Sequence, residues 1–250
     1  MSIAAVQEYL TTISDRVVRS MEIIEKEQSP YKQLLHISMD PRVKEFVPRI
    51  STRQAHGEDR TVPRVVTSPV LFGCILGYAS LTSDYRDMPV KSEKEPNSPW
   101  LNGYTIYALD YEVALKPKSS LVPDVVQTNE TWLVNYSPET KVYKPTKAGR
   151  FYCTELMYTA REGKRPMVSA IMFVEVLLDE GMYFYKNVLL KKGYWRLRVN
   201  VQDLDSWAAL TWKKPGLDMV EIDQKEWLSH KRGVADMLSI QDKIPAYVNW

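Results

Sequence analysis

Apolar residues at the start of the chain recur every three or four positions. This spacing forms one stripe of an amphipathic helix, and Ser29-Pro30 closes the pattern. The sequence therefore predicts a helix near residues 3–27. It packs on its own domain or, because the spacing also fits a short heptad seam, pairs with a partner. The residues of the stripe are Ile3, Val6, Leu10, Ile13, Val17, Met21 and Ile24.

The next part of the chain predicts short strands around one helix. Strands are expected at 34–38, 62–67, 104–109 and 131–136. Pro69 is suited to a first helical turn, and Leu71, Ile75 and Tyr78 then lie on one face of a helix. Residues 82–103 hold three prolines and seven charges without periodicity, so we expect a long, exposed and mobile loop there.

The last hundred residues read mainly as strands. An apolar run at 169–178, an aromatic and branched run at 182–190 and a clean alternation at 194–201 are separated by turns at Gly181 and at 191–193. Two helices are expected beyond them. One covers 205–213, and the other starts at Asp223 with a capping box completed by Glu226.

These elements predict an α+β protein with an amphipathic N-terminal helix, mixed or antiparallel sheets and C-terminal helices. The expected divisions are an N-terminal helix at 1–29, an α+β domain at 30–150 and a β-rich region with helices at 151–250. The alternative is one continuous domain. A chain of 250 residues with 44% hydrophobic content is large enough for a full core, which excludes disordered and fibrous classes.

Charge and cysteine content narrow the class of protein further. The net charge of +2 excludes an acidic DNA mimic and a strongly basic nucleic-acid coat. Cys74 and Cys153 form no disulfide framework, and the three histidines lack zinc-site spacing, so no metal is expected. Without an apolar leader or a membrane-length run, a soluble cytoplasmic protein is expected, with no membrane partner.

The stretch from residue 42 to 64 is rich in arginine. Arg49, Arg53 and Arg64 lie between two predicted strands and just before a helix start. A guanidinium group suits phosphate or carboxylate because two parallel N–H bonds fix a planar anion. The alternative is that these charges pair with local acids on a solvated loop.

The order of these elements resembles the ADP-ribosyltransferase fold, in its small bacterial and RNA-phosphotransferase-like branches. A strand carrying His36, the arginine-rich loop, a strand ending in Thr67-Ser68, a helix, a long loop, and Glu130 beside a later strand follow one another over about residues 30–150. Ile37 stands where the family usually has glycine. Residues 151–250 lie outside the resemblance.

The resemblance implies NAD as the cofactor and chemistry at its nicotinamide–ribose bond. His36 would hold a ribose, and Thr67 and Ser68 would flank the nicotinamide. Glu130 would stabilise positive charge developing on the sugar. The three arginines, Arg49, Arg53 and Arg64, would neutralise the pyrophosphate. Without that ligand, His36 is a satisfied strand histidine and Glu130 a surface residue.

A second group of residues is basic and aromatic. Cations beside stacking rings are typical of single-strand binders, although a mixed solvated sheet face has the same composition. Two hypotheses result. The chain is an ADP-ribosyltransferase-like enzyme or an inactive nucleotide-binding relative, or it is a non-enzymatic protein that binds a protein or nucleic acid through its N-terminal helix and this face. The group comprises Lys141, Lys144, Lys147, Arg150, Arg161, Lys164, Arg165, Tyr183, Tyr185, Lys186, Lys191, Lys192, Tyr194, Trp195, Arg196 and Arg198.

Overall fold

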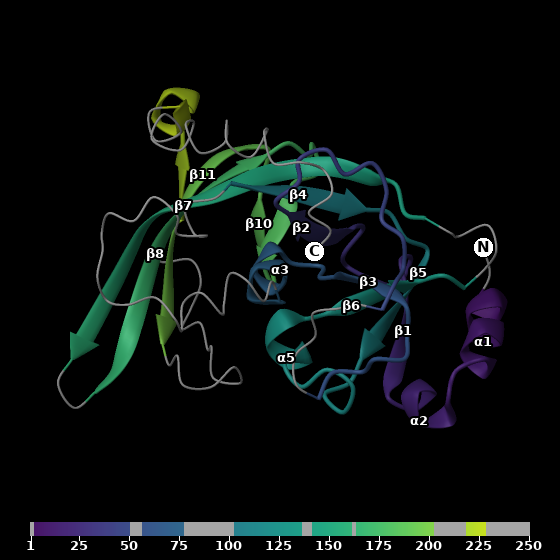
Figure 1. Cartoon of the computed structure of the whole chain (residues 1–250). Helices are drawn as coiled ribbons and strands as arrows, with labels where there is room; N and C mark the ends of the chain where they lie inside the picture. The colour runs from purple at the N-terminus through teal and green to yellow at the C-terminus, as the bar shows by residue number, and fades with distance from the viewer. Residues whose placement is uncertain are drawn as a thin grey trace. The chain divides into compact units, whose positions relative to one another are not determined.

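The computed structural model describes residues 3–50, 57–77, 103–136, 142–161, 164–202 and 219–228 (Figure 1). Its strand pairs are antiparallel, and helices accompany the sheets, which confirms the α+β class. No helix within these ranges is long and apolar enough to cross a membrane. The labelled helices within these ranges are α1 (Ile3–Thr11), α2 (Asp15–Val18), α3 (Leu71–Gly77) and α5 (Val125–Thr128), and residues 224–228 are helical as well.

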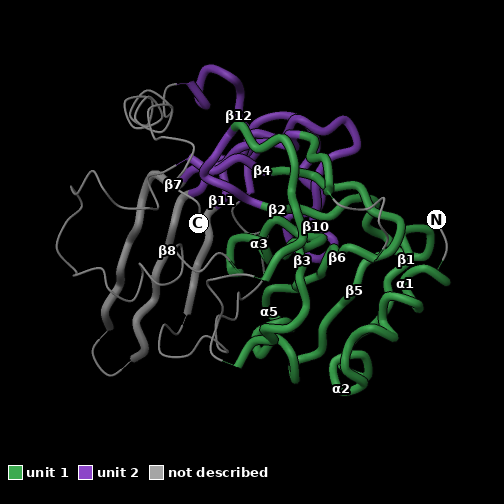
Figure 2. The backbone as a smooth tube through the Cα atoms, turned by 45° about the vertical axis from the view of Figure 1, so that its right-hand side comes forward, with its two compact units in different colours: residues 1–36, 42–77, 107–146 green, residues 37–41, 78–106, 147–250 purple. Residues whose placement is uncertain are grey.

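Contacts divide the chain into two compact units (Figure 2). Unit 1 comprises Met1–His36, Arg42–Gly77 and Tyr107–Thr146, and unit 2 comprises Ile37–Pro41, Tyr78–Ile106 and Lys147–Trp250. The long C-terminal part of unit 2 begins at residue 147, close to the predicted division at 150. The N-terminal segment is included in unit 1.

A four-stranded sheet organises unit 1. Its order is β1 (Met21–Glu25), β5 (Val113–Pro117), β6 (Thr131–Val134) and β3 (Arg64–Thr67). Both faces of this sheet are buried, since neighbouring residues of a strand join different apolar clusters. Trp132 and Val134 of β6 pack in one cluster, while Leu133 between them packs in the other.

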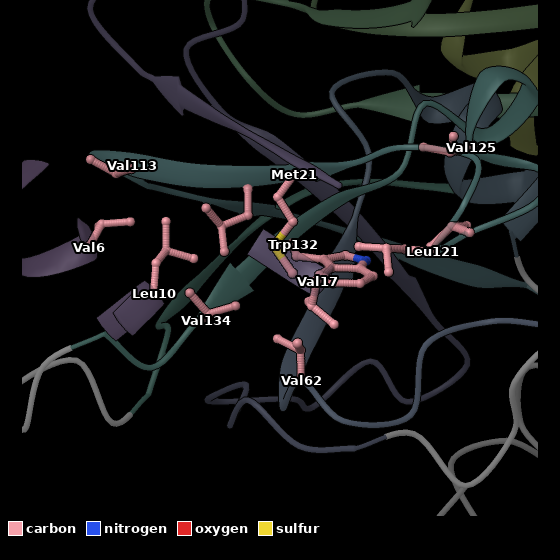
Figure 3. Packing of buried hydrophobic residues seen from close by; sticks show 12 residues of the cluster. Val6, Leu10, Val17, Met21, Val62, Val113, Leu121, Val125, Trp132 and Val134 are labelled. Carbon is pink, nitrogen blue, oxygen red and sulfur yellow. The ribbon is translucent and has the colours of Figure 1, made fainter. Parts of the chain in front are cut away.

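We call these two clusters the α1-side core and the β2-side core. The α1-side core is covered by the N-terminal helices, and Figure 3 shows the indole of Trp132 among Val17, Met21 and Leu121. The β2-side core contains Leu34 of β2 (Leu34–Ser38) and residues from β3, β5 and β6. Its members are Leu34, Val65, Leu109, Tyr111, Ala114, Leu133 and Tyr143.

The remaining strands form a six-stranded sheet and a hairpin. The larger sheet has the order β12 (Met219–Ile222), β11 (Gly193–Gln202), β8 (Lys164–Val176), β7 (Pro145–Arg161), β4 (Tyr104–Leu109) and β2. The hairpin pairs β9 (Met182–Tyr185) with β10 (Val188–Leu190). In unit 2, an aromatic group packs Tyr152 against Phe173 and Trp227.

The prediction of one helix over residues 3–27 is wrong beyond its first half. The helix stops at Thr11, α2 is a single turn, and residues 21–25 form β1, paired with β5. The apolar spacing continued through Met21, but adjacent Ile23 and Ile24 fill opposite faces of the sheet, which only a strand allows.

Several other predicted elements are confirmed by the structure. The strands at 34–38 and 104–109 match β2 and β4 exactly, and those at 62–67 and 131–136 contain β3 and β6. Residues 224–228 are helical, and the Glu226 amide donates to Asp223 Oδ1 at 2.7 Å, which confirms the predicted start. The predicted loop at 82–103, apart from its last residue, and the helix at 205–213 lie outside the described residues.

Glycine at position 73 allows α3 to approach α5 closely. A Cβ atom there would lie 1.9 Å from the carbonyl oxygen of Thr128 and 2.3 Å from Ser68 Oγ. No larger residue fits without moving backbone. This contact fixes the start of α3 against the segment that leads into Glu130 and β6.

Candidate functional site

The candidate site lies on the α1-side face of the four-stranded sheet, along the antiparallel pair of β3 and β6. Arg64 is paired in register with Val134, and Val66 with Trp132. Because side chains alternate along strands, the Arg64 side chain faces the same core as Trp132, and Glu130 precedes Trp132 by two positions. These positions bring one guanidinium, one indole and one carboxyl together.

Arg64 is an arginine with no exposed side-chain surface. Its Nη1 donates to the carbonyl of Val62 at 3.0 Å, and its Nη2 donates to the carbonyl of Asp59 at 3.0 Å and to the carboxylate of Glu58. The guanidinium carbon lies 4.1 Å from the ring centre of Trp132, a cation–π contact. Its Nε has no hydrogen-bond partner among the described residues.

Most of these contacts hold one loop, residues 57–62, which we call the strap. The amide of Asp59 donates to the carbonyl of Leu121 at 2.8 Å. The carboxylate of Asp59 accepts the amides of Thr61 at 2.9 Å and Val62 at 3.1 Å, which closes a tight turn. The strap is thus held to the rest of unit 1 by the side chain of Arg64 and by a backbone hydrogen bond to Leu121.

Glu130 is the buried carboxyl of the site, with 6% of its surface exposed. Its Oε1 accepts the indole N–H of Trp132 at 2.5 Å. Burial raises the pKa of Glu130 from 4.5 to about 7; the Trp132 bond and Arg64 oppose the rise, while Glu58 and Asp124 add to it. Near neutral pH this carboxyl therefore holds its proton about half of the time.

Asp124 is the second carboxyl with a raised pKa in this region. It directly precedes α5, and burial is the main cause of its shift, followed by the like charge of Glu58. We call the whole group the Arg64 cluster. It consists of Glu58, Asp59, Arg64, Asp124, Glu130 and Trp132.

The Arg64 cluster sets four carboxyl groups against the charge of Arg64. An ionised Glu130 would place a negative charge in a buried position near Glu58 and Asp124, both of which raise its pKa, and this is costly in a medium of low polarity. Protonation of Glu130 relieves that cost, because this carboxyl is deeply buried and its burial is the main cause of its raised pKa. The cluster can thus take up or release a proton near neutral pH.

His36 lies on the other side of the sheet. Its ring packs at 4.6 Å from that of Phe46, which packs on the β2-side core. The Nδ1 atom lies 2.8 Å from the carbonyl of Val66, so Nδ1–H donates and Nε2 is left as the acceptor of the neutral ring. Burial lowers the pKa of His36, the carbonyl bond opposes this, and the charge of Arg49 lowers it further.

The hydroxyl groups of Thr67 and Ser68 are both bonded to the backbone. Thr67 Oγ1 donates to the carbonyl of Thr131 at 2.7 Å, and Ser68 Oγ donates to that of Thr128 at 2.9 Å. Arg49 forms backbone hydrogen bonds with Arg64 at 3.2 and 3.0 Å.

The structure thus divides the predicted site residues into two groups. Arg64 and Glu130 belong to one cluster on the α1-side face, whereas His36 packs beside Arg49 and Phe46 on the β2-side face. A common surface for His36 and Glu130 stays a prediction. Arg53 lies outside the described residues. The roles that the family resemblance implies for these residues stay predictions.

The sequence drew attention to Arg64 and Glu130 but not to their partners. Glu58 lies in the charged run from His56 to Arg60, and Asp124 belongs to no motif. A signal for Trp132 existed in the spacing of two from Glu130, which places both on one face of a strand. No pattern along the chain could show that the charge of Asp124, six residues before Glu130, raises the pKa of Glu130.

Basic residues of unit 2 pair with acids of the same unit. Arg150 binds Glu175 at 2.7 Å, and Arg196 binds Glu226 at 2.9 Å. The third pair joins Lys192 to Asp179 at 2.6 Å. Tyr194 packs its ring 5.2 Å from that of Trp227. For these residues the structure favours a mixed sheet face with local ion pairs.

The remaining candidates carry no chemistry of their own. Cys74 is a free thiol that donates to the carbonyl of Leu35 at 3.1 Å, and burial raises its pKa to about 12, so it is not a nucleophile. In the part of the chain that the structure describes, no three His, Cys, Asp or Glu side chains are arranged to hold a metal ion.

Comparison with known proteins gives no relative: no family model, no curated protein and no solved structure matches the chain.

Proposed function

We propose that unit 1 is an ADP-ribosyltransferase-like module that binds NAD or a related phosphate-bearing nucleotide at the Arg64 cluster. The proposal includes cleavage or transfer at the nicotinamide–ribose bond. The observation that carries it is Glu130, a buried carboxyl with a pKa of about 7 placed beside a buried arginine. Strongly perturbed carboxyls with a specific charge partner are typical of functional sites.

Each group in the cluster has a part in this chemistry. A phosphate of the ligand would bind the Arg64 guanidinium in the place that the Glu58 carboxylate occupies, since both are anions suited to the same fork. The ionised Glu130 would stabilise positive charge on the ribose as the bond to nicotinamide breaks. His36, on the opposite face, takes no part in this site.

The free thiol of Cys74 fits a protein made in a reducing compartment, so the proposal places this activity in the cytoplasm. The alternative of an interaction protein draws less support. The apolar face of α1 is used within unit 1, because Val6 and Leu10 are buried in the α1-side core.

Ligand binding and nicotinamide release test the proposal together. Calorimetric titration with NAD and with ADP-ribose should show binding to the wild-type protein, and release of nicotinamide should be measurable by chromatography. Glu130→Gln should keep NAD binding and lower the release rate by about 10²–10³, the usual loss when one charge-stabilising group is removed.

Glu175→Gln is the matched control, because Glu175 is a buried acid that binds Arg150 in unit 2 and lies outside the Arg64 cluster. It should retain nicotinamide release within about threefold, the scatter expected when no group that contacts the reacting atoms is changed. Wild-type protein that neither binds NAD or ADP-ribose nor releases nicotinamide would overturn the proposal.

A further inference from the structure

Trp132 links the two charged groups that the proposed function uses. Its indole N–H donates to Oε1 of Glu130 at 2.5 Å, and the guanidinium carbon of Arg64 lies 4.1 Å from the centre of its ring. The N–H bond lies in the plane of the indole. The ring therefore contacts the arginine with its face and the carboxyl with its edge.

The fold fixes the position of this ring. Trp132 has no exposed surface and packs in the α1-side core (Figure 3). Its strand, β6, is paired on both sides, and in register Trp132 is opposite Val66 of β3 and Leu115 of β5. A ring enclosed by packed side chains on such a strand cannot turn away from its partner. The direction of the N–H donor is thus set before any ligand binds.

The indole engages one oxygen of Glu130 and leaves the other open. Oε1 accepts the indole N–H, whereas Oε2 accepts no hydrogen bond from the residues that the structure describes. A carboxyl that is held at one oxygen by a fixed donor keeps its orientation. Oε2 is then the oxygen that can meet positive charge on the ribose as the bond to nicotinamide breaks.

The cation on the ring face strengthens the bond at the ring edge. A positive charge over an aromatic ring is attracted by the electrons of its face, and neighbouring polar contacts polarise one another. The N–H therefore becomes a stronger donor. An ionised carboxylate gains more from such a donor than a neutral carboxyl does, because charge-assisted hydrogen bonds are stronger. Arg64 thus acts on Glu130 through Trp132 as well as directly.

We propose that Trp132 is a positioning residue: its indole N–H, supported by the Arg64 guanidinium, holds Glu130 with Oε2 available to the ligand. The inference rests on the proposed function, since Oε2 needs a ligand to stabilise. Trp132 acts through Glu130 without touching the ligand. Its removal should therefore affect the rate of bond cleavage and leave ligand binding largely unchanged.

The variant Trp132→Phe removes the N–H donor and retains an aromatic ring in the core. Nicotinamide release should fall about 10- to 100-fold, the usual loss when a group that orients a functional side chain is removed, while NAD binding by calorimetry stays within about threefold. Trp227→Phe is the matched control, because Trp227 is a buried tryptophan of unit 2 that lies outside the Arg64 cluster. It should leave both values unchanged.

The titration of Glu130 separates positioning from packing. Carbon-13 NMR of labelled glutamate carboxyl carbons measures its midpoint in each protein. In Trp132→Phe the midpoint should rise, because the pKa of Glu130 is lowered by the Trp132 bond that is lost. If Trp132 only filled the core, its loss would admit water and the midpoint would fall, since burial is what raises this pKa.

The outcomes distinguish this inference from the proposed function. A midpoint that falls or stays unchanged in Trp132→Phe, or an unchanged rate of nicotinamide release, would overturn the positioning role and leave the proposed function standing. Wild-type protein that neither binds NAD nor releases nicotinamide would overturn the proposed function, whatever the midpoint does. If Trp132→Phe fails to fold, the indole N–H signals of the wild-type protein decide. One of them should move as Glu130 titrates and stay still in Glu130→Gln, and the absence of such a signal would overturn the inference.

Discussion

The two units use the same kinds of charged residue in different ways. In unit 1, Arg64 is fully buried and faces several carboxyl groups. In unit 2, Arg196 pairs with the single carboxylate of Glu226, and both side chains keep more than a third of their surface exposed (43% and 35%). Water can solvate the charges of the exposed pair in unit 2, whereas the buried guanidinium of Arg64 depends on contacts within the protein.

The comparison teaches that excess buried charge, more than pairing itself, creates sensitivity to pH. A one-to-one pair at the surface contributes little and is screened by salt. A deeply buried carboxyl that lies near other acids keeps its proton to a higher pH, and Glu130 is such a carboxyl. The predictions below test this contrast.

The largest expected effect is loss of the buried arginine. Arg64→Ala should lower the free energy of unfolding by about 3–5 kcal/mol, since the fully buried guanidinium and its bonds to Glu58, Asp59 and Val62 would be lost together. Chemical denaturation with urea, followed by tryptophan fluorescence, measures this change. A loss below about 1 kcal/mol, the value for surface ion pairs, would show that Arg64 contributes no more to stability than the exposed ion pairs of unit 2.

The next effect concerns the pH dependence of stability. In the wild-type protein, the free energy of unfolding should fall by about 2–3 kcal/mol between pH 5 and pH 8 through Glu130, because the folded protein prefers the protonated carboxyl and that preference is lost as the pH rises through about 7. Glu130→Gln should remove this contribution and be the more stable protein at pH 8. Urea titrations of both proteins across this range provide the measurement. Parallel curves for the two would show that Glu130 has no part in the pH dependence.

A smaller effect is expected from the acid beside α5. Asp124→Asn should raise stability at pH 8 by less than about 1 kcal/mol, since it removes only one of the acids that act on Glu130. The pKa of Asp124 itself is raised, mainly by burial, so its ionised form also lowers stability at pH 8. Thermal unfolding at pH 6 and pH 8 should show the gain at pH 8 alone. If Asp124→Asn were less stable than the wild-type protein at both pH values, Asp124 would stabilise the start of α5 and its charge would have no effect on Glu130.

The smallest effects belong to the ion pairs of unit 2. Lys192→Ala and Arg196→Ala should each change stability by no more than about 1 kcal/mol, and high salt should abolish the difference. Urea denaturation at low and high salt distinguishes this from a buried pair. A salt-independent loss of several kcal/mol would place these pairs in the same class as Arg64.

Much of the fold could be predicted from local patterns. The strands at 34–38 and 104–109 were exact because short apolar runs of branched and aromatic residues favour strands. The start of the helix at Asp223 was visible in its capping residue. Residues 21–25 were misread because a spacing of three and four continued into a segment whose partner, β5, lies about ninety residues away in the sequence.

Individual residues of the site could be predicted from the sequence, but their arrangement could not. Arg64 and Glu130 were named from the residue types and their order, but the face each occupies depends on strand register and pairing. The hypothesis that joins His36 to Glu130 rests on residue order alone and stays a prediction. The raised pKa of Glu130 depends on burial and on charges brought in by the strap and the α5 segment, which no single stretch of sequence contains.

The central claim is that Glu130 holds a proton near neutral pH, and its titration tests this most directly. Carbon-13 NMR of protein labelled at the glutamate carboxyl carbons, with the Glu130 signal assigned from its absence in Glu130→Gln, follows that carboxyl alone. The account predicts a titration midpoint near 7. A midpoint near the ordinary value of 4.5 would show a carboxylate that is ionised throughout the physiological range and would contradict the account.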